Sequence, residues 1–129
     1  MDQATELAQR LGAFAEGAAH QGFLLVEPSG PPCVSVIFRS EDLRRLILRW
    51  DLRDRLALPP QDDAAIARRV CLWQLLFEPD DGPDHFFRRV GWPRTAEDLR
   101  AIADGTVHVL RRVYEVSEAR QLHFVLQRG

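Results

Sequence analysis

The segment FLLVEPSGPPCVSVIFR, residues 23–39, decides the fold that we expect for this chain. It begins with a short apolar run, and its second half alternates so that Val34, Val36 and Phe38 share one face. The proline- and glycine-rich residues 28–32 between these runs favour a turn, because proline fixes φ and glycine adopts conformations closed to other residues. Two β-like runs joined by such a turn predict an antiparallel hairpin.

Helical periodicity flanks this hairpin. Apolar residues recur at steps of three and four in the segments 3–21, 62–78 and 95–116, which is the spacing of an amphipathic helix. The stripe of the second segment consists of Ile66, Val70, Trp73 and Phe77. We expect that stripe, like Trp50 in the preceding segment, to face the core.

Helix starts carry capping residues. Asp2 and Asp62 each precede an apolar-periodic segment, and a side-chain oxygen at that position accepts from the first free backbone N–H groups. Thr95 with Asp98 three residues later resembles a capping box.

The rest of the chain is less decisive. Residues 40–53 favour a further helix that begins at Ser40, with a strand through 46–48 as the alternative. A short helical turn is expected at Phe86 and Phe87. The tail 121–126 alternates weakly and predicts a last strand beside the hairpin. The fold class is therefore α+β in a single domain, 1–129: an antiparallel sheet packed by several amphipathic helices.

Composition narrows the function classes. The chain has 17 basic residues, all arginine, against 19 acidic ones, for a formal charge of −2. Nucleic-acid binders and binders of acidic membranes usually show a clear basic excess, so neither is expected. No apolar run reaches the ~18 residues that span a bilayer, and the polar start MDQATE is no secretory signal. We expect a cytoplasmic protein.

No pattern for catalysis, cofactor binding or metal binding is present. Cys33 and Cys71 are flanked by apolar residues and are expected to be buried thiols. The histidines lack metal-ligand spacing, and no phosphate-binding glycine loop occurs. In the acidic loop 78–84, counting from Asp80 puts His85 where a calcium loop needs glycine. The sequence thus predicts no catalytic, cofactor or metal site.

Partner binding remains as a function. Aromatic side chains beside loop breaks either fill the core or line a groove, and they are favoured at protein-binding surfaces. Arginine clusters bind acidic groups if they are left unpaired. The candidate partner-binding residues are Phe86, Phe87, Trp92, Arg44, Arg45 and Arg49.

The chain resembles a known group of proteins in two segments. GFLLVE…PPCVSV within Gly22–Arg39, and VGWPRTAEDL with VLRRVYEV within Val90–Val116, are similar to small actinobacterial domains grouped with type III secretion chaperones and YbjN-like proteins. That resemblance implies helices packed on an antiparallel sheet and a non-enzymatic role in binding peptides or partner proteins. The family would place further strands in Ser40–Phe77, where the periodicity predicts two helices.

The leading hypothesis is accordingly a non-enzymatic, chaperone-like or adaptor module that binds a protein or peptide, with a homodimer left open. An immunity- or antitoxin-like protein that acts through the acidic loop 78–84 is the first alternative. A small enzyme that combines His85 or His123 with carboxylates of that loop is the second.

Overall fold

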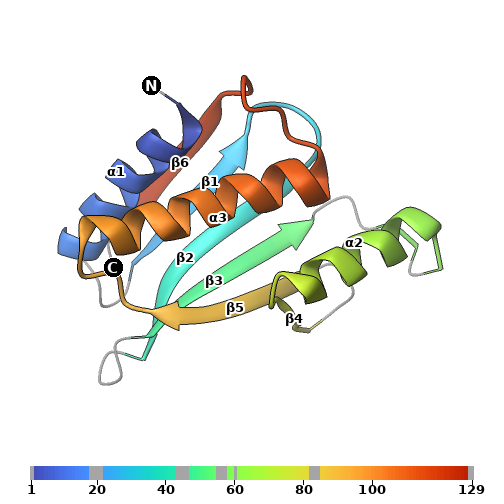
Figure 1. Cartoon of the computed structure of the whole chain (residues 1–129), viewed down its shortest axis with the longest axis horizontal. Helices are drawn as coiled ribbons and strands as arrows, with labels where there is room; N and C mark the ends of the chain where they lie inside the picture. Colours follow the sequence, from blue (N-terminus) through green and yellow to red (C-terminus); the bar gives the residue numbers. More distant parts are fainter. Residues whose placement is uncertain are drawn as a thin grey trace.

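The structure is a computed structural model that describes residues 2–17, 22–42, 47–54, 58–59, 61–81 and 85–127. Within these residues the chain forms an antiparallel sheet in the strand order β4-β5-β3-β2-β1-β6, with three helices (Figure 1). The elements in chain order are α1 (Gln3–Gly17), β1 (Phe23–Pro28), β2 (Val34–Asp42), β3 (Ile47–Asp54), α2 (Asp63–Gln74), β4 (Glu78–Pro79), β5 (His85–Gly91), α3 (Ala96–Tyr114) and β6 (Leu122–Gln127).

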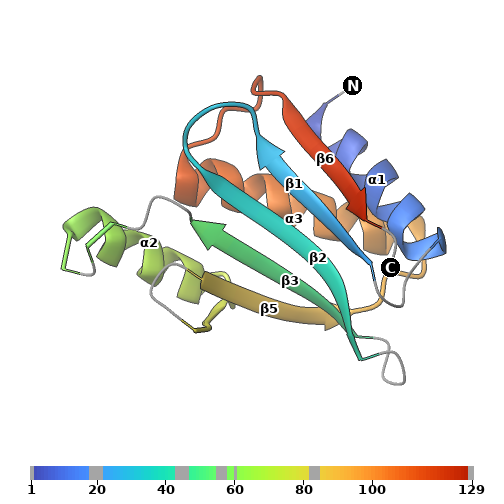
Figure 2. The same cartoon turned by 180° about the vertical axis from the view of Figure 1, so that it is seen from behind.

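The molecule has two layers. Helices α1 and α3 lie against one face of the sheet, while α2 lies at its β4–β5 end (Figure 1). Seen from behind, the opposite face carries no helix among the described residues (Figure 2). We call this second face the open face. Alternate strand residues such as Leu24, Val36 and Leu52 form one apolar core with Leu11 and Leu110 of the helices.

The α+β prediction is confirmed. The hairpin pairs Val26 with Val36 in an antiparallel register, and the predicted last strand joins it, with Leu126 opposite Leu24. The predicted caps also form. Asp2 accepts from the backbone N–H of Thr5 at 2.7 Å, and the box at the start of α3 is complete. The hairpin and the two caps are set by residues close together in the sequence.

The helix predicted over 40–53 is wrong. Strand β2 continues to Asp42, and β3 occupies Ile47–Asp54 between β2 and β5. Leu48 and Trp50 point toward the helices, whereas Arg49 lies on the open face. This period-two alternation was present in the sequence, but pairing with strands on both sides decides in its favour.

The short helical turn predicted at Phe86 and Phe87 is also wrong, because β5 runs through both residues. Adjacent residues of a strand point to opposite faces, so Phe86 and Phe87 enter opposite sides of the sheet. Both are nevertheless buried. Two apolar residues therefore follow one another here because other side chains cover β5 on both faces.

The expectation of two buried thiols fails as well. Cys33 is exposed just before β2, and Cys71 on α2 is only partly buried. Cys33 ends the turn of the hairpin, where the chain is at the surface, so its apolar neighbours in the sequence do not cover it.

Candidate functional site

Helix α2 is defined by its two ends. The N-cap Asp62 accepts from the backbone N–H of Ala64 at 2.8 Å, as its position in the sequence predicted. At the other end, Leu76 adopts a left-handed conformation with φ of 69°. The N–H of Phe77 then donates to the carbonyl of Leu72 at 2.9 Å, and that of Leu76 to Trp73 at 3.0 Å. This is the Schellman arrangement, which usually has glycine at the left-handed position.

A few contacts hold α2 to the rest of the chain. Leu72 is its one fully buried residue among those described, and Phe77 just after the helix is buried as well. Arg68 bonds to Asp54 at the end of β3 at 2.8 Å, and its guanidinium carbon lies 5.5 Å from the ring centre of Tyr114 on α3. The helix is thus anchored along one side only.

The other side of α2 is apolar and faces outward. Trp73 is 72% exposed and Leu76 66%, while Ile66 and Val70 are nearly half exposed. We call these four residues the α2 outer face. The prediction that the Ile66–Phe77 stripe packs into the core is wrong for all but Phe77, whereas Trp50 is buried as predicted.

An apolar hollow adjoins this outer face. It has a volume of about 280 Å³ and lies between α2 and the β4–β5 hairpin. Its lining consists of Ile66, Arg69, Val70, Trp73, Pro79 and Phe86. Scaling ordinary side-chain areas by the observed exposures gives the α2 outer face roughly 400 Å² of apolar surface, the size of the largest apolar patch on a typical monomer, which is often functional.

Leucine at position 76 has a conformational cost. A side chain at positive φ brings Cβ close to the carbonyl oxygen, which costs about 1 kcal/mol relative to glycine. The conformation places this leucine beside Trp73 with most of its surface in water. Neither the backbone conformation nor the solvent exposure favours leucine at position 76. The stability of the folded chain alone therefore does not explain why leucine occupies this position.

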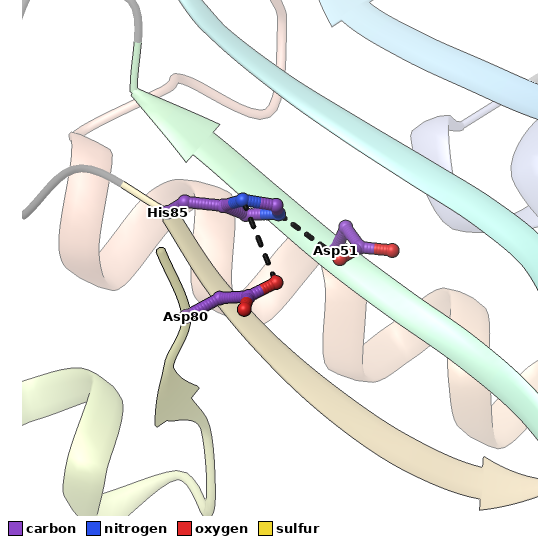
Figure 3. Close-up of side chains that lie close together, drawn as sticks. All are labelled: Asp51, Asp80 and His85. Carbon is purple, nitrogen blue, oxygen red and sulfur yellow. Dashed lines mark hydrogen bonds and ion pairs between the residues drawn. The ribbon is translucent and has the colours of Figure 1, made fainter. Parts of the chain in front are cut away.

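A second cluster lies on the open face. Asp51 on β3, His85 on β5 and Asp80 just after β4 point toward one another (Figure 3). His85 Nε2 is 3.0 Å from Asp51 Oδ1, and its Nδ1 is 3.7 Å from Asp80 Oδ2. The Asp51 side chain is only 3% exposed. The pairing of β3 with β5 brings these side chains together from distant parts of the sequence.

Arginines neutralise this cluster. Arg49 bonds to Asp51 at 2.9 Å and also to Asp80, while Arg39 Nε is 3.3 Å from the other oxygen of Asp51. The pKa of Asp80 is lowered by a backbone hydrogen bond from Asp81 and by the charge of Arg49.

Arg49 and a further arginine, Arg89, cover Phe87, and both reach Glu41. Arg49 and Arg89 lie 4.3 and 4.7 Å from the ring centre of Phe87, which explains its burial on the open face. The pKa of Glu41 is lowered by its hydrogen bond to Arg89, which measures 2.5 Å. The open face at this end of the sheet is thus covered by an ion-pair network.

The cluster has the donor set of a small cation site. The ligand atoms of Asp51, Asp80 and His85 lie within 4.8 Å of one another. However, the guanidinium of Arg49 already bonds to both carboxylates, so a positive charge is in place between them. The arrangement is suited to tying β3 to the β4–β5 hairpin.

The enzyme alternative had grouped His85 with the acidic loop, and the structure does bring His85 to Asp80. His123 lies on β6, at the opposite edge of the sheet. Among the described residues, the side chain of His85 is bonded to carboxylates and to no serine, threonine or cysteine. The described part of the chain thus gives His85 no nucleophile to activate.

The predicted partner-binding residues are distributed over several environments. Phe86 and Phe87 are buried, and Trp92 is partly buried against Phe14 with ring centres 5.8 Å apart. Arg49 belongs to the ion-pair network. Arg44 and Arg45 lie outside the described residues. The α2 outer face was missed, because a 3.6-residue period cannot distinguish a stripe that packs inward from one that is left exposed.

No protein-family model matches the chain, and neither the curated proteins nor the solved structures contain a significant match. Among the described residues, no helix combines the length and apolar character needed to cross a membrane.

Proposed function

We propose that this protein is a non-enzymatic, chaperone-like or adaptor module that binds a protein partner through the α2 outer face. The observation that carries the proposal is the exposed row formed by Ile66, Val70, Trp73 and Leu76 beside an apolar hollow. The partner supplies an apolar segment, for example one face of an amphipathic helix, which fills the hollow and covers Trp73.

Energetics favour such a partner. A 12-residue helix is marginal alone in water, so α2 depends on tertiary contacts, and those are few on its inner side. Covering the outer face adds apolar burial to a helix that lacks it. Tryptophan is one of the residues enriched in binding hot spots, and losing a hot-spot side chain costs about 2 kcal/mol or more, roughly thirtyfold in affinity.

The resemblance of Gly22–Arg39 and Val90–Val116 to chaperone-like domains supports the same class of function. The resemblance concerns other segments than α2, and the exposed apolar side chains beside the hollow carry the proposal for this surface. The acidic-loop alternative receives less support, because Asp80 is already bonded to Arg49 within the described part of that loop.

The test uses a double variant, Val70→Asp with Trp73→Gln, and the control Gln74→Glu, which changes an exposed residue of the same helix. Tagged wild type and both variants are used to capture partners from the native cell, with quantification by mass spectrometry. We expect a partner that wild type and control retain equally and that the double variant loses at least tenfold.

Circular dichroism must show the same helix content in all three proteins, so that lost capture reports the surface. If the captured set is the same for the double variant and the wild type, the α2 outer face is not the binding surface. Light scattering of the purified proteins distinguishes a second copy of the chain from a different partner.

A further inference from the structure

A second hollow lies between α3 and the C-terminal half of β5. Its volume is about 380 Å³, and its lining includes Trp50, Arg88, Val90, Trp92, Ile102 and Gly105. The lining is largely apolar, and the indoles of Trp50 and Trp92 and the guanidinium of Arg88 carry hydrogen-bond donors. This groove takes no part in the proposed docking surface on α2.

The indole of Trp50 has an unpartnered donor. The residue is only 2% exposed, and its Nε1 finds no hydrogen-bond acceptor among the described residues. Its ring is held by Phe38 on one side and Phe77 on another, with ring centres 6.0 and 5.0 Å away. Buried indole N–H groups are normally paired, so this one is a donor available to an acceptor beyond the described residues.

Arg88 supplies the second donor group. It lies directly opposite Trp50 in the register, and its guanidinium carbon is 5.9 Å from the centre of the indole ring. Arg49, Arg68 and Arg89 each bond to a carboxylate, but Arg88 has no carboxylate partner among the described residues. A partly buried guanidinium without a counter-ion favours an anion.

The groove is open because α3 carries a glycine where it passes Trp50. A Cβ added at Gly105 would stand 3.0 Å from Cη2 of the indole. Asp98 also borders the groove, and its Oδ2 accepts from the backbone N–H groups of Arg94 and Thr95 at the start of α3. The groove therefore brings together the unpartnered indole N–H of Trp50 and the guanidinium of Arg88.

We propose that this groove binds a carboxylate carried on an apolar body. Arg88 moves off the face of Trp50 and pairs with the carboxylate, and the indole N–H donates to one of its oxygens. The apolar body lies against Val90, Trp92 and Ile102. A small organic acid and the C-terminal carboxylate of a peptide share this chemistry, and the experiment separates them.

The experiment follows the indole N–H resonances of ¹⁵N-labelled protein during titration. Trp73→Phe and Trp92→Phe variants assign the three indole signals without altering Trp50. The probes are phenylacetate, its neutral analogue phenylacetamide, and acetyl-leucyl-phenylalanine with a free or an amidated C-terminus. We expect phenylacetate or the free-acid peptide to shift the Trp50 signal and leave that of the exposed Trp73 in place.

Two comparisons decide the role of charge. Each neutral analogue should bind at least tenfold more weakly than its acid, and Arg88→Gln should weaken acid binding at least tenfold. Arg112→Gln changes an exposed arginine on α3, outside the groove, and should leave binding unchanged. A shift with phenylacetate identifies a small-acid site, and one with the peptide alone a C-terminus site.

The proposal is overturned if neither acid moves the Trp50 signal, or if Arg88→Gln binds as tightly as wild type. Both outcomes are independent of partner capture by the α2 outer face, so either proposal can fail alone.

Discussion

Trp50 on β3 and Trp73 on α2 show where the structure differs from the prediction made for α2 from the sequence. The periodicity places Trp50 and Trp73 alike in the core, whereas the structure exposes 2% of the first and 72% of the second. Truncating a buried tryptophan to alanine costs about 3–5 kcal/mol. For Trp73, the contact that remains amounts to roughly 60 Å², or at most about 1.5 kcal/mol at 25 cal/mol per Å².

Two further effects reduce the cost at position 73. The unfolded chain already covers part of its apolar surface, and alanine is a better helix former than tryptophan by a few tenths of a kcal/mol. We therefore expect Trp73→Ala to lower the free energy of unfolding by about 1 kcal/mol or less. Trp50→Ala should lose about 3–5 of the 5–15 kcal/mol that a domain of this kind has, enough to risk unfolding it, so Trp50→Phe serves as its folded counterpart, with a loss of about 1–2 kcal/mol.

Urea unfolding followed by far-ultraviolet circular dichroism measures both losses without relying on tryptophan fluorescence. The slope against urea must stay constant, so that a changed midpoint reports stability. A loss above about 3 kcal/mol for Trp73→Ala would mean that the side chain is packed in solution, and it would refute the exposed outer face and the function proposed for it.

Three other perturbations test particular contacts. Gly105→Ala brings a methyl group to 3.0 Å from the Trp50 ring, so we expect a net loss of stability in urea despite the helix-propensity gain of about 1 kcal/mol. Burial raises the pKa of Tyr114, the sole tyrosine. Its unfolded form therefore ionises first, and stability should be constant below about pH 10 and fall above it, a dependence that Tyr114→Phe removes in alkaline melts. Arg49→Gln leaves the buried Asp51 carboxylate without its 2.9 Å partner, so urea unfolding should show a loss of about 3 kcal/mol.

The features that the sequence predicted correctly depend on neighbouring residues. The β1–β2 hairpin needs only two strands and the turn between them, and the caps at Asp2 and Thr95 are satisfied within a few residues. Segment 47–54 was predicted wrongly because its alternation competes with a helical spacing over the same residues. Only the flanking strands β2 and β5, the latter from a segment more than thirty residues away, favour the extended form.

The site residues also depend on contacts between distant segments, which the sequence does not reveal. Asp51, Asp80 and His85 meet only after β3 pairs with β5, so no spacing in the sequence marks them as a group. For α2, the sequence gives apolar residues on two sides of the helix. The register of the helix against the core is decided at its C-terminal end, where Leu72 and Phe77 are joined by the Schellman hydrogen bond and are both buried.

That choice has a consequence for the opposite side of the helix. Once Leu72 and Phe77 face inward, helical geometry turns Ile66, Val70 and Trp73 away from the chain. Replacing Trp73 would cost the fold about 1 kcal/mol or less, and glycine at position 76 would have relieved a left-handed backbone. The exposed apolar side chains at these four positions thus stabilise the isolated chain little and would contribute more if the surface were covered, which is the physical reason for proposing α2 as the binding surface.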